Sequence, residues 1–401
     1  MNKHHVADFA LFGGKPAFDA FRTTMNLVIP DRDVFFEHAK KSFDARHMTN
    51  NGPVVRELEE QLARFHQTGH CIAFCNCFTG MFVAMRHLAL PGKNEVVVPS
   101  LTYRRMADII DWAGLLPRFC DVDPQTLGIS PATARPCINE NTALILAPHP
   151  ITHLCDIEGM EALAAEYGLP LMFDSVEACG GDHRGKMIGG FGNCESFSMH
   201  PSKVLNSCEG GYITTNDDKL AQTLRSARAF GFSGRDTIAM LGYNAKLNEL
   251  HAAVGMATLS GIEQQLADNK RLHLAYQAQL GGLSGVTVIS YDMNAKRNWK
   301  SLLVRLDEAW PFSREKTLQL LNAENIHARA HYSPPQHSTF PRQAGKGEIP
   351  LPVTDEAATN HLLLPFGSTM SVEDTEIVGR VFHSMAALQN DLRAKEVGIT
   401  S

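Results

Sequence analysis

The sequence predicts an α/β protein built on a mostly parallel sheet, and the order of its apolar segments carries that prediction. Between residues 51 and 255, helical patterns such as MFVAMRHLAL and IEGMEALAAEYG, each ended by Gly or Pro, separate several short apolar runs. Near-continuous apolar strands that alternate with helices are typical of a parallel sheet covered on both faces. The predicted strands are CIAFCN, EVVVPS, LPRFCDVD, TALILAPH, LPLMFDSV, ESFSM and GGYITT.

At 401 residues the chain is long enough for a large domain and a smaller one. We expect residues 1–50 to form an N-terminal arm that packs on the small domain, residues 51–255 the large domain, and residues 256–401 a small α+β C-terminal domain. The small domain holds a helix in LSGIEQQLADNKRLHLAYQAQL, a strand in KSLLVRLD and a helix in SREKTLQLLNAENI, whereas KGEIPLPVTDEAA is predicted to be a polar connection. A cleft between two lobes is the default position for a binding site.

The composition is that of an ordinary globular protein, with 44% hydrophobic and 20% charged residues and a net charge of −6. The sequence contains no concentrated Lys/Arg stripe, so we expect no nucleic-acid partner. It contains no apolar run of membrane-spanning length, so we expect no membrane partner. The first residues lack the pattern of a signal peptide, and we therefore expect a cytoplasmic protein.

The nine cysteines lie between Cys71 and Cys208, mostly inside apolar segments. An odd number of cysteines in such segments favours reduced core thiols over a disulfide framework. Without a C-x-x-C pair a structural zinc site is unsupported, and we expect no metal. A redox pair formed by Cys75 and Cys77 is the alternative interpretation.

A predicted strand turns into a helix at Cys77-Phe78-Thr79-Gly80. The free N–H groups at the start of a helix, together with the Thr79 hydroxyl, would bind a phosphate group. The alternative is that Thr79 only caps the helix.

Asp174 ends the predicted strand LPLMFD, at the edge of the sheet where a parallel sheet binds its ligands. A carboxylate there can hydrogen-bond a protonated ring nitrogen of a cofactor. The alternatives are a cap of the following turn and a metal ligand, and no His/Asp cluster beside it supports the metal.

Lys203 lies in the turn SMHPSKVLNSCEGG, which connects two predicted strands. A lysine in a partly desolvated turn can have a lowered pKa and form a Schiff base. Ser198, at the end of the first strand, is placed to bind phosphate. A surface lysine is the alternative for Lys203, and helix capping is the simplest role for Asn244 in GYNAKLNELHAAVG.

Taken together, these segments resemble the sugar aminotransferases of the DegT/StrS type, which are fold-type I enzymes dependent on pyridoxal 5′-phosphate (PLP). The resemblance covers residues 45–385 and rests on TNNGPVVRELEEQLARF, EVVVPSLTY, FCDVDPQTLGI, GKMIGGFGNCESFSMHPSK, EGGYITTNDD and GYNAKLNELHAAVG, besides the Asp174 segment. It implies a mostly parallel seven-stranded sheet with helices on both faces and a smaller α+β C-terminal domain.

The resemblance also assigns roles to single residues. Lys203 matches the lysine that binds the cofactor covalently and moves protons, and Asp174 matches the partner of the pyridine nitrogen. Asn244 matches a residue that family dimers supply to the neighbouring subunit's phosphate, which implies a homodimer with shared active sites. The remaining matches are Tyr103, stacked on the cofactor ring, and the phosphate ligands Thr79 and Ser198 with the backbone N–H groups of Phe78 and Thr79.

Three departures from the family pattern concern the same site. Glu177 stands where relatives have His or Gln against the cofactor's ring hydroxyl; it would either tune the cofactor, if paired or protonated, or point away. The family loop His-x-x-Gly-x-Pro-x-Asp occurs at residues 149–156 without its Gly, and Phe78 replaces a small residue.

Four further residues are candidates for binding an anionic substrate. Arg104 and Arg105 follow Tyr103, where relatives mostly carry small or apolar residues, and they would bind a carboxylate or remain solvated on the surface. Arg329 and His331 lie in a family segment that reaches toward the cleft, where they would bind a carboxylate or a phosphate. A structural role is the alternative for His331.

The resemblance implies transamination from an amino acid, glutamate by analogy, to a keto sugar, which would be nucleotide-linked. Relatives that are dehydratases carry His in place of the lysine, so Lys203 argues against that activity. The altered loop leaves a cyclitol or another non-sugar ketone as an alternative acceptor. A non-catalytic PLP-binding regulatory protein is the alternative from another functional class.

Overall fold

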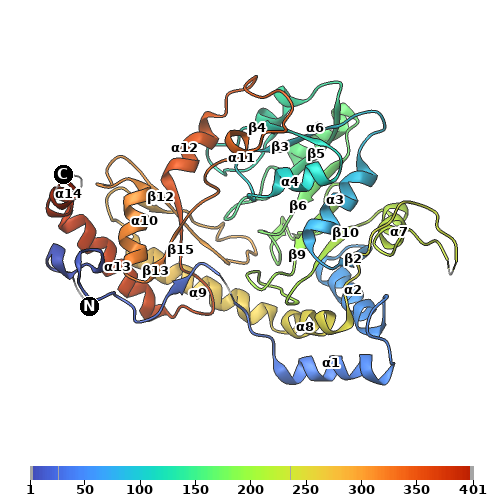
Figure 1. Ribbon diagram of the computed structural model, residues 1–401, viewed down its shortest axis with the longest axis horizontal. Coiled ribbons are helices and arrows are strands. Elements are labelled where there is room, and N and C mark those ends of the chain that lie inside the picture. Colours follow the sequence, from blue (N-terminus) through green and yellow to red (C-terminus); the bar gives the residue numbers. More distant parts are fainter. Residues whose placement is uncertain (1–2, 26, 235, 398–401) are drawn as a thin grey trace.

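The computed structural model describes residues 3–25, 27–234 and 236–397; the predicted domain limits at residues 1 and 401 fall outside them. Its largest element is a seven-stranded sheet with the strand order β2-β10-β9-β6-β5-β3-β4 (Figure 1). Every strand is parallel to its neighbours except β10, which is antiparallel to both β2 and β9. These strands are β2 (His70–Phe74), β3 (Glu95–Pro99), β4 (Leu116–Cys120), β5 (Thr142–Pro148), β6 (Leu171–Asp174), β9 (Cys194–Ser198) and β10 (Gly211–Thr215).

Helices cover both faces of this sheet, as the sequence predicts. Alternate residues of each strand belong to different hydrophobic clusters, so that Ile145 of β5 packs on one face and Leu146 on the other. One face is covered by α2 (Pro53–His66), α6 (Ile157–Tyr167) and α8 (Glu249–Ser260), and the other by α3 (Cys77–Leu88), α4 (Met106–Trp112) and α7 (Asp218–Ala227). The short segments between strands and helices are α5 (Pro131–Ala134), the 3-10 turn Arg135–Cys137, and the hairpin β7 (Asp182–His183) and β8 (Lys186–Met187).

The start of α2 shows how the chain enters the large lobe. Asn50 and Asn51 have φ angles of 60° and 61°, the left-handed conformation that asparagine tolerates, and Pro53 opens the helix. The buried carboxylate of Glu249 from α8 accepts hydrogen bonds from the Val54 and Val55 amides, at 2.7 and 3.2 Å. A remote side chain therefore caps the helix, which fixes α2 against α8.

The small lobe contains a four-stranded antiparallel sheet with the order β11-β12-β15-β14, and Figure 1 shows its helices beside this sheet. The hydrophobic core of this lobe is separate from the two clusters of the large lobe. Its elements are α9 (Ile262–Leu280), β11 (Val286–Val288), β12 (Leu302–Leu306), α10 (Arg314–Ala323), β13 (Ile326–His327), β14 (Arg329–Ala330), α11 (Gln336–Thr339), α12 (Pro352–Asn360), β15 (His361–Leu364), α13 (Val372–Ala387) and α14 (Gln389–Val397).

The N-terminal region contacts both lobes. The first part, with the 3-10 turns Val6–Asp8 and Ala10–Phe12, adds Val6, Phe9 and Phe18 to the small-lobe core, and β1 (Arg22–Thr23) pairs with β13. The following helix α1 (Arg32–Asp44) packs against α8 and α2 instead. The domain limits at residues 50 and 255 stay a prediction.

The segment KGEIPLPVTDEAA, predicted to be a polar connection, contains the start of helix α12. Asp121 accepts hydrogen bonds from the Val353 and Thr354 amides at 3.0 and 2.8 Å, which caps this helix from the large lobe. Ala357 and Ala358 are buried. The prediction is wrong because the partners that stabilise the helix are remote in sequence.

Within the described ranges, no helix is long and apolar enough to cross a membrane. The nine cysteines are all free thiols, of which seven are buried, Cys75 is half-buried and Cys208 is exposed.

Candidate active site

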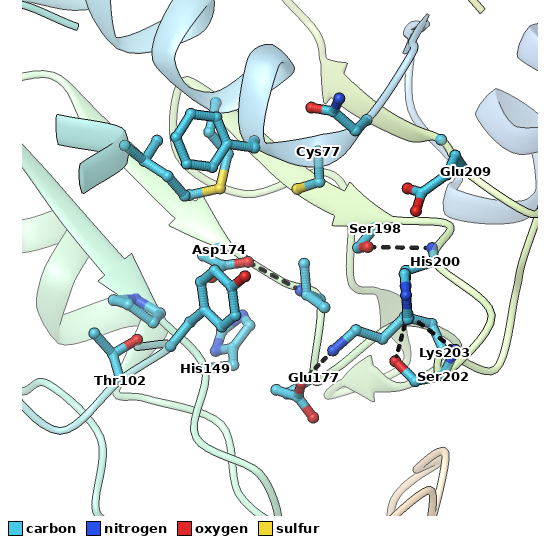
Figure 2. A pocket seen from close by; sticks show the side chains of 18 of the residues that line it. Cys77, Thr102, His149, Asp174, Glu177, Ser198, His200, Ser202, Lys203 and Glu209 are labelled. Carbon is cyan, nitrogen blue, oxygen red and sulfur yellow. Dashed lines mark hydrogen bonds and ion pairs between the residues drawn. The ribbon is translucent and has the colours of Figure 1, made fainter. Parts of the chain in front are cut away.

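The candidate site is a cavity of about 360 Å³ at the carboxyl ends of the central strands (Figure 2). Pro148 ends β5, Asp174 ends β6 and Ser198 ends β9, and all three residues line the cavity. Tyr332 from the small lobe lines it as well. The cavity therefore lies where the fold class places ligands, with a contribution from the second lobe.

Lys203 points into this cavity from the segment between β9 and β10, where its amide donates to the His200 carbonyl in a turn. Its Nζ donates a hydrogen bond to Oε1 of Glu177 at 2.9 Å. Burial alone would lower the pKa of Lys203, but the charge and hydrogen bond of Glu177 raise it above its ordinary value. The sequence-based expectation of a lowered Lys203 pKa is therefore wrong for the protein without cofactor, because it did not take the contact with Glu177 into account.

Asp174 is buried beside the same cavity, with 8% of its surface exposed. Its Oδ1 atom accepts from the Val176 amide at 3.3 Å and from the Ser196 hydroxyl at 3.5 Å. Within the described part of the chain, no donor contacts Oδ2. Burial raises the pKa of Asp174 to about 6. A cationic partner at Oδ2 would offset the free-energy cost of burying the ionised carboxylate.

The side chain of Glu177 points toward Lys203 and not away from the site (Figure 2). Its second carboxylate oxygen lies 2.6 Å from Nζ of Lys300, a buried residue just before β12. Burial would raise the pKa of Glu177, but Lys203 and Lys300 together hold it well below its usual range. Of the two outcomes that the sequence left open for Glu177, the paired one is found.

At the other end of the cavity, helix α3 begins at Cys77. Asn76, and not Thr79, caps the helix, because the Asn76 side chain accepts from the Thr79 amide at 2.8 Å. The amides of Cys77 and Phe78 are left at the helix start for an anion, and both residues line the cavity. Gly211 allows this close approach, since a Cβ atom there would lie 2.3 Å from the Cys77 nitrogen.

Ser198 lines the same end, and its hydroxyl accepts from the His200 amide at 3.3 Å. Thr79 does not line the cavity; its hydroxyl lies 4.0 Å from the Cys75 sulfur. The role of Thr79 as a phosphate ligand stays a prediction, as does that of Ser198.

The aromatic residues of the site come from both lobes. Tyr103 lies at the cavity with half of its surface exposed, and Gln336 donates to its carbonyl at 3.0 Å. Tyr332 also lines the cavity and is half-buried, and its φ of 39° lies in the left-handed region. Burial and the charges of Glu177 and Asp174 raise the pKa of Tyr332 well above its usual value. No sequence motif points to Tyr332 or to Lys300 as a site residue.

The predicted anion-binding residues separate into two groups. Arg104 donates to the Ala330 carbonyl at 3.1 Å, which brings it beside the segment that contains Arg329, and burial and the charge of Arg329 lower its pKa. Arg105 faces away and pairs with Asp108 on α4 at 3.1 Å. None of the three lines the cavity.

His331 is buried with its Nδ1 atom unpartnered among the described residues, and its ring lies against that of Tyr332 at 4.2 Å. Burial lowers its pKa to about 3. Asn244 is exposed, outside this chain's cavity, and accepts from Lys246 at 2.6 Å. It does not cap α8, whose cap is Asn248.

The loop at residues 149–156 keeps an ordered structure without the family's Gly. The His149 ring stacks on Phe173 at 5.5 Å, and its Nδ1 atom lies 3.3 Å from both the amide and the sulfur of Cys155. Burial lowers the pKa of His149 to about 3. Asp156 caps α6 by accepting from the Gly159 amide at 3.0 Å. His149 also lines the cavity.

The mostly parallel seven-stranded sheet has a buried carboxylate at a strand end and a lysine in the segment between two strands, and with the comparisons it defines the class: the chain is an aminotransferase of fold type I. More narrowly, it belongs to the DegT/DnrJ/EryC1/StrS aminotransferase family, whose model matches residues 31–383. The predicted fold class, enzyme class and family resemblance are confirmed. Membership implies PLP as the cofactor.

Individual relatives agree over nearly the whole chain. GDP-perosamine synthase of Caulobacter vibrioides is 28% identical over 345 residues, 85% of this chain and 92% of that protein. The dTDP-4-amino-4,6-dideoxy-D-glucose transaminase of Escherichia coli is 27% identical over 350 residues, with 86% and 93% covered. The structure of DesI in the presence of its TDP-sugar product superposes with a TM-score of 0.91 at 32% identity, covering 98% of this chain and 100% of that one.

Proposed function

We propose that this enzyme carries PLP on Lys203 and transfers an amino group from an amino acid, glutamate in the first place, to a nucleotide-linked keto sugar. The observation that carries the proposal is the convergence of Lys203 and Asp174 on one cavity at the strand ends. The sugar part is supported by the relatives, since those named above are a GDP-sugar enzyme, a dTDP-sugar enzyme and a protein solved with its TDP-sugar product.

The residues around the cavity fit PLP on three counts. Lys203 supplies a primary amine for the cofactor's aldehyde. Asp174 supplies a buried carboxylate, whose Oδ2 accepts no hydrogen bond from the described part of the chain, for a protonated ring nitrogen. The start of α3 supplies backbone amides for a phosphate. Tyr103 would cover the face of the ring, as the family resemblance implies.

When bound, PLP serves as an electron sink that stabilises negative charge on a substrate carbon. The side chains of the protein hold and move the protons. Asp174, which is buried and has no cation bonded to its carboxylate among the described residues, would keep a proton on the ring nitrogen. The Nζ atom of Lys203 would take a proton from the α-carbon of the amino donor and deliver it to a carbon of the cofactor. This requires that the Lys203 amine be neutral when it accepts the proton.

We also propose a homodimer in which Asn244 reaches the partner's phosphate site. Asn244 is exposed and lies outside its own cavity. The segment before it exposes Phe230, Ile238 and Leu241 at 48%, 69% and 70%. Apolar side chains gathered in this way are typical of protein interfaces. The remaining expectations, a cytoplasmic location and the absence of nucleic-acid and membrane partners, stay part of the proposal.

The test is amino transfer by the purified protein loaded with PLP. With glutamate we expect 2-oxoglutarate in an amount equal to the enzyme, and catalytic turnover once a dTDP- or GDP-linked keto sugar is added. Lys203→Ala should abolish turnover, and Lys219→Ala, at an exposed position on α7, should leave it unchanged. Turnover by Lys203→Ala would refute the role of Lys203. Amination of free ketones but of no nucleotide sugar would refute the proposed acceptor.

A further inference from the structure

The Glu177 carboxylate joins two lysines at the candidate site, the half-buried Lys203 and the buried Lys300. Oε1 of Glu177 accepts from Lys203 at 2.9 Å, while Oε2 lies 2.6 Å from Nζ of Lys300. The side chains of Glu177, Lys300 and Lys203 are 12%, 8% and 21% exposed, so water screens the Lys300 pair weakly and the Lys203 pair somewhat more. Lys203 belongs to the large lobe and Lys300 to the small lobe.

The small lobe delivers Lys300 through an unusual stretch of backbone. Trp299 has a φ of 53°, a conformation that bulky residues avoid, and its ring is held between His273 and Tyr291 at centroid distances of 5.2 and 4.8 Å. The preceding Asn298 donates to the Glu177 carbonyl at 2.8 Å. Both sequence neighbours of Trp299 therefore contact Glu177: Asn298 binds the backbone carbonyl of Glu177, and Lys300 binds its carboxylate.

The charges of these groups impose a condition on catalysis. Lys203 acts on a proton only when its own amine is neutral, but Glu177 favours the charged form of that amine. Once Lys203 loses its charge, Glu177 would be a buried carboxylate without its first partner, which is costly. Lys300 is the other cation in contact with Glu177 among the described residues; burial lowers its pKa, Glu177 raises it, and the charge of Lys203 lowers it, so loss of the Lys203 charge favours a charged Lys300.

We propose that Lys300 is a positioning residue for Lys203: it keeps Glu177 paired from the small lobe, so that Lys203 can give up its proton without leaving a buried carboxylate alone. The inference rests on the proposed function, because it concerns the lysine that would carry the cofactor. The titratable groups that face Glu177 are Asp174 from the end of β6, Lys203 from the segment before β10, and Lys300, Tyr291, His331 and Tyr332 from the small lobe.

The test measures the reactivity of Lys203 in protein without PLP. Acetic anhydride labels only neutral amines, and peptide mass mapping over a range of pH values gives the labelling rate of Lys203 relative to exposed Lys219. Lys300→Met should lower this rate at least about tenfold at pH 8, because Glu177 then pairs with Lys203 alone. Lys300→Arg keeps the charge and should stay within about twofold of the wild type.

The double variant Glu177→Gln/Lys300→Met separates this role from a general effect on structure. With the carboxylate neutralised, we expect labelling of Lys203 at or above the wild-type rate. A normal rate in Lys300→Met, or a double variant that keeps the full loss, would overturn the inference. If Lys300→Met fails to fold, the comparison of the double variant with Glu177→Gln decides: a difference above about threefold overturns it.

The labelling requires no cofactor, so its result is independent of PLP attachment. Failure of PLP to attach to Lys203 would refute the proposed function and leave the labelling rates as they are. In the loaded enzyme, the pH at which the visible absorption of bound PLP changes should shift in Lys300→Met and return toward the wild-type value in the double variant.

Discussion

The two lobes contribute to the site in different ways. The large lobe supplies Asp174 and Ser198 from strand ends and Lys203 from the segment that joins two neighbouring strands of the sheet. The small lobe supplies Lys300 and Tyr332 from irregular segments, in which Trp299 and Tyr332 have left-handed φ angles of 53° and 39°.

This difference indicates that the two lobes have different roles in the site. A sheet edge brings residues that are distant in sequence to fixed positions, which suits the groups that bind the cofactor and transfer protons. Irregular segments depend on packing at each position, and here they bring a second cation to Glu177. Large-lobe substitutions should therefore abolish chemistry, and small-lobe substitutions should change pH dependence and stability.

The largest effect in this comparison after loss of Lys203 should come from Asp174→Asn. An amide cannot provide the negative charge that holds a proton on the ring nitrogen, so we expect turnover to fall by about 10²-fold or more. Steady-state kinetics of the PLP-loaded protein measure this effect, with Asp218→Asn at the exposed start of α7 as the control. A decrease in turnover of less than about threefold would contradict a role of Asp174 in the reaction.

Gly211→Ala tests how closely the start of α3 must approach the sheet. Its Cβ would lie 2.3 Å from the Cys77 nitrogen, so the helix start must shift. We expect a loss of about 2–3 kcal/mol in the free energy of unfolding and weaker PLP binding. Urea denaturation and PLP titration measure these, and Gly234→Ala, where no atom lies within 4 Å of the added Cβ, is the control. Unchanged values in both assays would contradict the packing argument.

His273→Phe tests the small lobe beneath Trp299. Neither ring nitrogen has a partner among the described residues, and burial lowers the pKa of His273 to about 4. The unfolded chain takes up this proton below about pH 6.5 and the folded chain does not, so stability falls as pH falls from 6.5 toward 4. The difference in the free energy of unfolding between the variant and the wild type should therefore be about 2 kcal/mol more in favour of the variant at pH 5 than at pH 8.

Urea denaturation at both pH values measures this difference, and exposed His327→Phe is the control. An equal effect of His273→Phe at pH 5 and pH 8 would show that the histidine is not kept neutral in the folded protein.

The smallest effect should come from Arg105→Ala. Arg105 is exposed and pairs with Asp108 on α4, whereas Arg104 reaches the small lobe, so KM for both substrates should stay within about twofold in Arg105→Ala. Arg104→Ala should instead raise KM for an anionic substrate, because Arg104 and Arg329 lie close together beside the small-lobe wall. Steady-state kinetics distinguish the two variants, and equal effects would contradict the separation of these arginines.

The large lobe was predictable because its signals are local. Apolar runs gave the seven strands, and Asp174 and Ser198 follow from their positions at strand ends. Individual side-chain contacts escaped prediction. Asn76 caps α3 where the neighbouring Thr79 was the candidate, Asp121 caps α12 from a distant segment, and Glu177 reverses the expected direction of the Lys203 pKa. Lys300 looked like the polar start of a strand, and its role depends on the fold around Trp299.

The central claim is that Lys203 is the anchor of PLP, and borohydride reduction tests it most directly. The purified protein is incubated with PLP, reduced and digested, and its peptides are mapped by mass spectrometry. We predict a pyridoxyl adduct on Lys203, which lines the cavity, with Lys300 unmodified because it is buried outside the cavity lining. An unmodified Lys203, or an adduct mainly on Lys300, would contradict the account.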